Sequence, residues 1–411
     1  MQNSQVLVVG GGPAGSSAAY FLAKAGIEVI LLDKDKWPRD KVCGGGLSAT
    51  CLDLLSEMDL ADEVEAKADS KFSRYVVYAP GGEALKARIS RRAGNKAVSA
   101  EYSYVVRRSV FDQMLLDKAS QAGTHILTEV NVKEVKAGEE PTVTTESGEN
   151  FQADILVVAD GSGGRVSRQL KKYTYEEAGI AIRGYYSGIK GFGKDLEFFL
   201  DDKIGFGYGW VFPLAEGLAN VGVGIGTPFL KKRNSNIHQL LADMLENPHL
   251  KTRMRDAKLE GKLASFPLRV DYNKSAFRMG RVLFAGDAAK LVFPLSGEGI
   301  AYALKSGKIA AEIISDVYGD NLIDYNHLAR YEVECHKAFK DFKQAMRLQK
   351  VMGRPKIQHF FFSSAAYDEK LGQKAISLLE HSSRVSIPAS LSVLLKSIWV
   401  ALKRKFTLSK T

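Results

Sequence analysis

A glycine-rich turn near the start of the chain has the residue types and spacing that bind a dinucleotide. Gly10, Gly12 and Gly15 form G-x-G-x-x-G within the segment Gly10-Gly11-Gly12-Pro13-Ala14-Gly15. In such a turn the first glycine permits the tight bend, the second lets a pyrophosphate approach the backbone, and the third lets the helix pack on the sheet. Asp33 ends the next apolar run, where its carboxylate can accept from a ribose hydroxyl. This combination favours nucleotide binding over a structural glycine turn.

Two further turns follow apolar runs and point to the same site. Asp160 lies in Ala159-Asp160-Gly161, and Asp287 lies in Gly286-Asp287-Ala288-Ala289. A chain with both turns resembles the FAD-binding superfamily that includes p-hydroxybenzoate hydroxylase. The resemblance implies that Asp287 binds the ribityl chain or ribose, and that the helix after Gly297-Glu298-Gly299-Ile300 points its N-terminus at the pyrophosphate and flavin.

Arg108-Ser109-Val110-Phe111-Asp112 matches the R-x-x-F-D element of that superfamily. The match implies that Arg108 contacts a phosphate or the flavin. The alternative is a surface helix start with a charge in its first turn.

An aromatic strand is the next element with chemical meaning. Tyr208, Trp210 and Phe212 alternate before Pro213, and Gly222-Val223-Gly224 follows in a second strand-like run. Alternating residues of a strand share one face, so the three rings point the same way. The glycines let something large and flat approach the backbone. The alternative is an ordinary antiparallel sheet core.

Three segments narrow the resemblance to the geranylgeranyl reductase family. They are Pro38-Arg39-Asp40-Lys41-Val42-Cys43-Gly44-Gly45-Gly46-Leu47-Ser48, the YxWxFP…GxG pattern from Tyr208 to Gly224, and Leu295-Ser296-Gly297-Glu298-Gly299-Ile300. The similarity covers roughly residues 1–330. It implies an FAD enzyme, acting on CH–CH groups, that saturates isoprenoid double bonds by hydride transfer from reduced flavin. The implied substrate is a prenyl-chain lipid, quinone or pigment.

The expected site residues follow from these motifs and this resemblance. Cys43 is the candidate catalytic residue, as proton donor or redox partner, with a purely structural thiol as the alternative. No metal site is expected. The expected cofactor contacts are Gly10, Gly12, Ala14, Gly15, Asp33, Arg39, Gly44, Gly45, Leu47, Arg108, Val132, Asp160, Gly286, Asp287, Gly297, Gly299 and Ile300. The expected substrate contacts are Tyr208, Trp210, Phe212, Pro213, Gly222 and Gly224.

The sequence departs from the family pattern at two positions. Lys290 replaces the usual glycine after Gly-Asp-Ala-Ala, and Phe293 replaces the usual asparagine before proline. Lys290 either places a cation near the flavin or the substrate head group, or is a solvent-exposed helix residue.

The electron source is open, because the chain offers no second G-x-G-x-x-G unit for a resident NADPH domain. NADPH, ferredoxin or another electron carrier would each serve. Two other functions remain: a flavin monooxygenase or halogenase of the same fold, and an electron-carrying flavoprotein without its own substrate. Halogenases have Trp-x-Trp-x-Ile-Pro where this chain has Tyr208 and Phe212. Iron–sulfur carriers need clustered cysteines, whereas Cys43, Cys51 and Cys335 are scattered.

Composition bounds the class of protein. The 411 residues are 45% hydrophobic and 25% charged, with a formal net charge of +10. No basic block with interleaved aromatic residues suggests nucleic acid binding, and no apolar stretch is long enough to span a membrane. We expect a cytoplasmic protein. The segment 386–411 is basic, amphipathic and contains Trp399, so it either binds the inner membrane surface or packs on the body of the protein.

The elements that must position these residues form an α/β pattern. Gln5–Val9, Pro13–Lys24 and Glu28–Leu32 read as strand, helix and strand, as in a Rossmann-like unit. Further helices are expected at Asp53–Ala66, Phe111–Ala122, Ile237–Glu246 and Gly299–Val317, and strands at Phe72–Tyr78, Ile126–Val135, Asp154–Val158 and Val282–Ala285. We predict a discontinuous FAD-binding domain (1–70, 100–175 and 275–330), an antiparallel-sheet substrate domain (71–99 and 176–274) and a helical C-terminal region (331–411).

Overall fold

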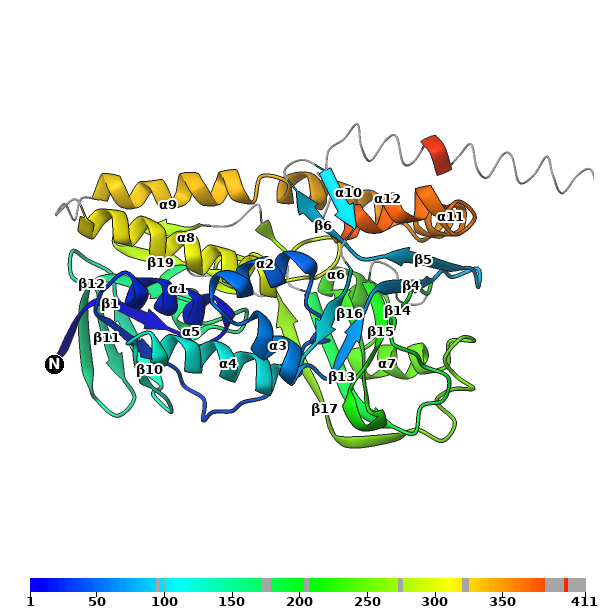
Figure 1. Ribbon diagram of the computed structural model, residues 1–411, viewed down its shortest axis with the longest axis horizontal. Coiled ribbons are helices and arrows are strands. Elements are labelled where there is room, and N and C mark those ends of the chain that lie inside the picture. Colours follow the sequence, from blue (N-terminus) through cyan, green and yellow to red (C-terminus); the bar gives the residue numbers. More distant parts are fainter. Residues whose placement is uncertain are drawn as a thin grey trace, which may run out of the picture.

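The computed structural model of the chain is shown in Figure 1. It describes residues 1–93, 96–99, 101–171, 179–202, 204, 207–272, 276–319, 325–380 and 395–397. Two large sheets stand side by side, and helices cover them (Figure 1).

The first sheet has parallel strands at its centre. Its main order is β10 (Val132–Lys136), β11 (Thr142–Thr145), β12 (Asn150–Val158), β1 (Gln2–Val9), β2 (Val29–Leu32) and β9 (His125–Leu127). β19 (Val282–Phe284) also pairs in parallel with β12 and carries β18 (Arg278–Met279). β1, β2, β12 and β9 run parallel, which explains why the buried runs of β1, β2 and β12 are apolar on both faces.

The register of these strands brings four sequence motifs to one edge. Val9 lies opposite both Leu32 and Val158, and Val158 lies opposite Phe284. Each of these residues ends its strand. The turns that follow therefore start at the same level of the sheet, at the carboxyl ends where ligands bind in such folds.

Helices cover this sheet. α1 (Pro13–Lys24) packs between the sheet and α8 (Ile300–Gly319), and α4 (Arg108–Gln121) also contacts α1. The approach of α8 is close, because a Cβ on Gly307 would lie 2.2 Å from the carbonyl oxygen of Ala14. α5 (Arg165–Lys171) lies near β10.

The second sheet is mostly antiparallel. Its order is β17 (Lys258–Leu268), β13 (Gly179–Ser187), β16 (Ala219–Gly226), β15 (Gly207–Pro213), β14 (Leu196–Phe199), β4 (Arg74–Tyr78) and β5 (Ala84–Arg88). The pair β14–β4 is parallel. α7 (Ile237–Leu245) packs one face with Leu240, Leu241 and Met244, while α6 (Thr227–Lys232) follows β16.

The remaining elements connect or flank the two sheets. Small two-stranded sheets pair β3 (Ser70–Phe72) with β8 (Ser103–Val105), and β6 (Ser90–Ala93) with β7 (Lys96–Ser99). The helices α9 (Tyr325–Ala338), α10 (Phe342–Met352), α11 (Pro355–Ala366) and α12 (Glu369–Leu379) run along one side of the molecule, from the first sheet to the second (Figure 1). In the described part of the chain, no helix combines the length and the hydropathy needed to cross a bilayer.

The predicted fold class is confirmed, including the Rossmann-like sheet, the second sheet and the helical C-terminal part. Two predicted elements were wrong. Asp53–Ala66 is not one helix but α2 (Ala49–Glu57) and α3 (Ala61–Lys67), separated by Asp59 at φ 53°. Ile126–Val135 is not one strand, since β9 and β10 occupy opposite edges of the first sheet. The domain boundaries stay a prediction, and within the segment 386–411 only residues 395–397 are described.

Candidate active site

The turn after β1 is shaped to admit a ligand at one position only. A Cβ on Gly10 would lie 2.4 Å from the carbonyl oxygen of Ala159, and one on Gly15 would lie 1.8 Å from that of Gly10. These two glycines are therefore needed for the fold itself. A Cβ on Gly12 would meet only the Nη2 atom of Arg39, at 3.5 Å. The space beside the Gly12 backbone is therefore open to a ligand.

The helix that begins at this turn can bind an anion. α1 starts at Pro13, and Gly12 provides no side-chain cap. The first amides of a helix have no intrahelical acceptor, and they carry the positive end of the helix dipole. The amides of Ala14 and Gly15 are in this position. The side chain of Ala14 is buried against Gly286, so Ala14 offers a ligand its backbone rather than its methyl group.

Asp33 holds the same turn and keeps some capacity for a ligand. Its Oδ2 atom accepts from the amide of Gly11 at 2.6 Å, and its Oδ1 atom accepts from Asp35 N at 2.9 Å and Trp37 Nε1 at 3.2 Å. A carboxylate can accept about four hydrogen bonds, so an acceptor position remains for a ribose hydroxyl. Val132 lies nearby, since the amide of Val130 bonds to the carbonyl of Asp33.

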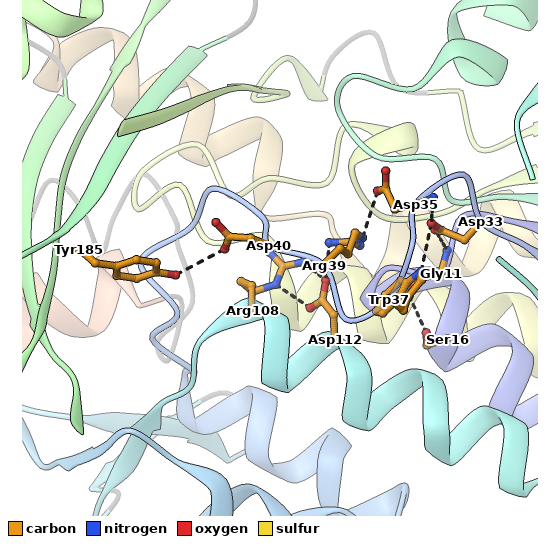
Figure 2. Close-up of polar contacts among 10 residues, drawn as sticks. All are labelled: Gly11, Ser16, Asp33, Asp35, Trp37, Arg39, Asp40, Arg108, Asp112 and Tyr185. Atoms are coloured by element: carbon orange, nitrogen blue, oxygen red, sulfur yellow. Dashed lines mark hydrogen bonds and ion pairs between the residues drawn. The ribbon is translucent and has the colours of Figure 1, made fainter. Parts of the chain in front are cut away.

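A buried charge cluster lies beside this turn (Figure 2). Asp112 receives two hydrogen bonds from Arg108, at 2.6 and 2.7 Å, and pairs with Arg39 at 3.1 Å. Burial opposes the charge of Arg108, but its interactions with Asp112 and Cys43 together outweigh that effect and raise the pKa of the guanidinium. The alternative of a surface helix start for Arg108 was wrong, because only 7% of Arg108 is exposed. Arg39 also pairs with Asp35 at 3.4 Å, so two arginines face two carboxylates, and the remaining guanidinium N–H groups suit a phosphate.

The second acid turn has a local structural role. The Oδ2 atom of Asp160 accepts from the amide of Ser167 at 3.0 Å, at the start of α5. Burial raises the pKa of Asp160. Its Oδ1 atom is buried without a partner among the described residues. Asp287, in contrast, is half-buried, with Oδ1 3.4 Å from the place of a Cβ on Gly299.

The two departures from the family pattern are both core positions. Lys290 is 1% exposed, has φ 61°, and pairs through Nζ with Asp271 at 2.6 Å. The alternative of a solvent-exposed helix residue was therefore wrong, while a cation near the flavin or the substrate head group stays a prediction. Phe293 is fully buried and stacks on Tyr302 with ring centroids 5.8 Å apart.

The aromatic strand β15 connects two glycine loops. The first glycine loop is Cys43-Gly44-Gly45-Gly46, and the second is Ser296-Gly297-Glu298-Gly299. The Tyr208 hydroxyl donates to the carbonyl of Ser296. Trp210 donates through Nε1 to Asn220 Oδ1 at 3.0 Å, and the amide of Asn220 donates to the carbonyls of Cys43 and Gly44 at 2.7 and 3.1 Å. β15 and its neighbour β16 therefore fix the positions of both loops.

The first glycine of the GxG pattern, Gly222, leaves room for a ring of the protein itself. A Cβ on Gly222 would lie 2.3 Å from the Trp210 ring, whereas one on Gly224 would have no contact closer than 3.7 Å. The same holds for Gly44, whose Cβ would lie 2.5 Å from the ring of Phe212. The flat group that approaches Gly222 is therefore Trp210.

A cavity of about 310 Å³ lies between the second sheet, the two loops and α10–α12. Most of its wall is apolar, including Phe72, Leu196, Phe198, Trp210 and Phe212. Eleven of the predicted site residues line it. They are Cys43, Gly44, Gly45, Leu47, Tyr208, Trp210, Phe212, Gly224, Gly297, Gly299 and Ile300. Pro213 and Gly222 do not line it, and the carbonyl of Pro213 accepts from Ser70 Oγ at 2.7 Å.

Two acids on this wall were not among the site residues predicted from the sequence. Burial raises the pKa of Glu298 to about 7, and a hydrogen bond with Ser48 partly offsets this. The Oε1 atom of Glu298 is shielded from solvent and has no hydrogen-bonding partner among the described residues. Burial raises the pKa of Glu380 to about 8, against hydrogen bonds with Ser90 and Tyr75. The sequence signal that could have identified Glu298 is a single acid between two glycines in an apolar segment. Nothing near Glu380 in sequence marked it.

Lys41 and Cys43 complete the polar groups of the first glycine loop. Burial lowers the pKa of Lys41 to about 8, and nearby Asp287 opposes this. The ammonium of Lys41 lies 3.5 Å from the centroid of the Phe266 ring. The Cys43 thiol accepts from the amide of Gly45 at 3.4 Å and also hydrogen-bonds with Arg108, so it is bound within its own loop.

The amino-acid sequence is similar to those of known proteins over most of its length. The FAD binding domain family matches residues 3–345. Geranylgeranyl diphosphate reductase of Nicotiana tabacum is 32% identical over 90% of this chain and 79% of its own. Digeranylgeranylglycerophospholipid reductase 2 of Methanopyrus kandleri is 30% identical (84% and 86% covered), and menaquinone reductase of Mycolicibacterium smegmatis is 28% identical (86% of each).

Solved structures share the fold. A geranylgeranyl bacteriochlorophyll reductase-like protein from Thermoplasma acidophilum aligns with a TM-score of 0.75 at 24% identity, over 97% of this chain and 96% of its own. The flavin-dependent brominase Bmp2 also aligns with a TM-score of 0.75, at 20% identity over 100% of each chain. The same fold therefore serves different activities.

The fold and the glycine cradle define an FAD-binding oxidoreductase. The chain belongs to the FAD binding domain family and, within it, to the geranylgeranyl reductases. The cofactor is FAD, and the space kept at Gly12 and the guanidinium groups of Arg39 and Arg108 fit its pyrophosphate.

Proposed function

We propose that this protein is a reductase that saturates carbon–carbon double bonds of an isoprenoid chain on a lipid, quinone or pigment. The observation that carries the proposal is the apolar cavity, which is continuous with the glycine loops of the FAD site. A prenyl chain offers only apolar surface and π-bonds, and aromatic rings provide a broad apolar contact for it. The named activities of the relatives from tobacco, Methanopyrus and Mycolicibacterium support the same substrate type.

FAD, when bound and reduced, supplies a hydride for such a saturation. The backbone of Gly12, Ala14 and Gly15 and the arginines at 39 and 108 would hold its phosphates. Tyr208, Trp210 and Phe212 orient the chain and exclude water from it.

Saturation of a double bond also needs a proton, and Glu298 can hold one in the cavity. Its buried carboxyl has a pKa near 7, so it is substantially protonated at neutral pH. Its Oε1 atom has no competing partner among the described residues. We assign the proton donor to Glu298 rather than Cys43, since the Cys43 thiol is already bonded to Gly45 and Arg108.

The test is anaerobic reduction of prenyl compounds by the FAD-loaded protein, with chemically reduced flavin so that the natural electron donor need not be known. Mass spectrometry should show a gain of two hydrogens per saturated bond. In a parallel aerobic assay, substrate-dependent oxygen consumption with an oxygenated or halogenated product would instead support a monooxygenase or halogenase. Flavin that is reoxidised only by a protein carrier or a quinone ring, with every double bond retained, would support an electron carrier.

A further inference from the structure

Among the described residues, the cavity wall carries two acids and no basic side chain. Glu298 and Glu380 both line the cavity, and no lysine, arginine or histidine is among the described residues that line it. The two acids are close enough that Glu298 contributes to the raised pKa of Glu380. The nearby positive charges, on Lys41, Arg39 and Arg108, belong to the cofactor side. Asp112 pairs with Arg39 and Arg108. Lys41 packs over the Phe266 ring within electrostatic range of Asp287.

The acids are placed to hydrogen-bond rather than to pair with cations. Glu380 caps α12, and its Oε2 atom accepts from Ser90 Oγ at 2.8 Å. The hydroxyl of Tyr75 also hydrogen-bonds with Glu380, and Tyr75 lies within electrostatic range of Glu298. Gln358, which is 5% exposed, adds an amide to the same wall. These groups offer O–H and N–H donors to an uncharged oxygen.

A diphosphate would meet an unfavourable wall here. Proteins bind phosphates with arginine, lysine, metal ions or helix N-termini, because the multiple negative charge must be compensated when it leaves water. In this cavity the diphosphate would lie in low-dielectric surroundings with no basic side chain on the described part of the wall. It would also oppose ionisation of the two acids, since like charges repel strongly there. A carbonyl or hydroxyl head group carries no such cost.

We infer that the cavity selects isoprenoid substrates with an uncharged, oxygen-bearing head group and discriminates against the prenyl diphosphate. This inference rests on the proposed function, and it separates this chain from the tobacco relative that is named for the diphosphate.

The experiment compares binding by the full-length, FAD-loaded protein. Quenching of tryptophan fluorescence is titrated with geranylgeraniol, with a geranylgeranyl quinone and with geranylgeranyl diphosphate, below their micelle concentrations. The alcohol and quinone should bind at least tenfold more tightly than the diphosphate, a difference of about 1.4 kcal/mol. Equal affinities, or tighter binding of the diphosphate, would overturn the inference.

Variants identify the groups responsible. Glu298→Gln and Glu380→Gln keep the size and hydrogen-bonding capacity of each side chain but cannot become negative. At pH 9, where both wild-type acids are ionised, the double variant should therefore reduce the discrimination severalfold. Glu134→Gln removes an exposed acid on β10 and should leave the ratio unchanged. Unchanged discrimination in a double variant that retains FAD would overturn the assignment to these acids. If none of the three compounds binds, the isoprenoid function itself fails, and the inference fails with it.

Discussion

Asn220 on β16 is bonded to Trp210 and Cys43 at the same time, with its Oδ1 atom accepting from the indole at 3.0 Å and its Nδ2 atom donating to the Cys43 carbonyl at 2.7 Å. The side chain is 2% exposed. Through this single amide, the aromatic strand and the first glycine loop are held at a fixed separation.

Replacement of Asn220 should therefore disturb catalysis more than cofactor content. Asn220→Leu leaves the indole N–H and two loop carbonyls without their partner, which costs about 1–3 kcal/mol for each group left unsatisfied. We expect a lowered Tm, at least tenfold slower substrate reduction, and FAD retained. Trp210→Phe is the matched variant, since it removes only the indole donor and keeps a ring. If Asn220→Leu matched wild-type turnover, the bridge would have no functional importance.

The two glycines of the GxG pattern should respond differently to the same substitution. Gly222→Ala places a methyl group 2.3 Å from the Trp210 ring and 2.5 Å from the Ile182 carbonyl, so the ring and strand must move. Overpacking of this kind costs about 1–3 kcal/mol. Gly224→Ala meets nothing closer than 3.7 Å and should be close to neutral for stability. Thermal unfolding of the two variants checks this, and similar Tm values would contradict it.

Substitutions in the glycine turn after β1 should likewise separate effects on the stability of the fold from effects on FAD binding. Gly15→Ala would bring a Cβ to 1.8 Å from Gly10 O and should destabilise the fold. Gly12→Ala has room in the protein alone, but its methyl group would occupy the approach of the pyrophosphate. We expect a Gly12→Ala protein with a near-normal apoprotein Tm and FAD affinity weakened at least tenfold, measured by equilibrium dialysis. Normal FAD affinity in that variant would move the phosphate site elsewhere.

The rate of alkene reduction should fall as pH rises through about 7. The folded protein holds Glu298 protonated up to that pH, and a proton donor is lost above it. Glu298→Gln should be slow at every pH and lack this transition. The same raised pKa affects stability: the contribution is fully present below the ordinary pKa of a glutamate and is lost as pH rises through about 7. The pKa values of Lys41 and Glu380 are near 8, so a change in rate near pH 7 could come from any of the three groups. Only its absence in Glu298→Gln would assign the change in rate to Glu298. A pH profile that the variant shares with wild type would remove Glu298 from the mechanism.

The buried pair of Lys290 and Asp271 should matter for stability alone. Lys290→Met leaves the Asp271 carboxylate in the core without its cation, which costs about 3–5 kcal/mol, whereas the double variant Lys290→Met/Asp271→Leu removes both charges and should recover part of that loss. Denaturant unfolding of both variants measures the difference. A double variant less stable than Lys290→Met would show that the pair is not the relevant interaction.

The sequence alone predicted the elements that depend on local pattern. The turns at Gly10 and Gly286 and the strands Val6–Val9 and Ile155–Val158 have strong local signals, because glycine spacing and continuous apolar runs are specific to these structures. The bridge through Asn220 could not be predicted, since Asn220 and Cys43 are distant in the chain and meet only when the second sheet packs on the loop. Glu380 was missed for the same reason: only the packing of α12 brings it to the cavity.

The role of Gly222 shows a further limit. A glycine pattern indicates that a group approaches the backbone closely, but not which group. In this chain the group is a tryptophan of the neighbouring strand rather than a ligand. The aromatic rings were predicted correctly as one face of β15, while their anchoring to the loops followed from tertiary contacts.

The walls of the cavity differ in how freely they can change. β15 is bonded to the cofactor loops directly through Tyr208 and, by way of Asn220, through Trp210, so a substitution there alters the flavin site as well. In the described part of the chain, β4, β14, α11 and α12 face the cavity without those bonds. New substrate preferences can therefore arise, in evolution or in the laboratory, by remodelling the outer walls while the inner strand keeps the chemistry in place.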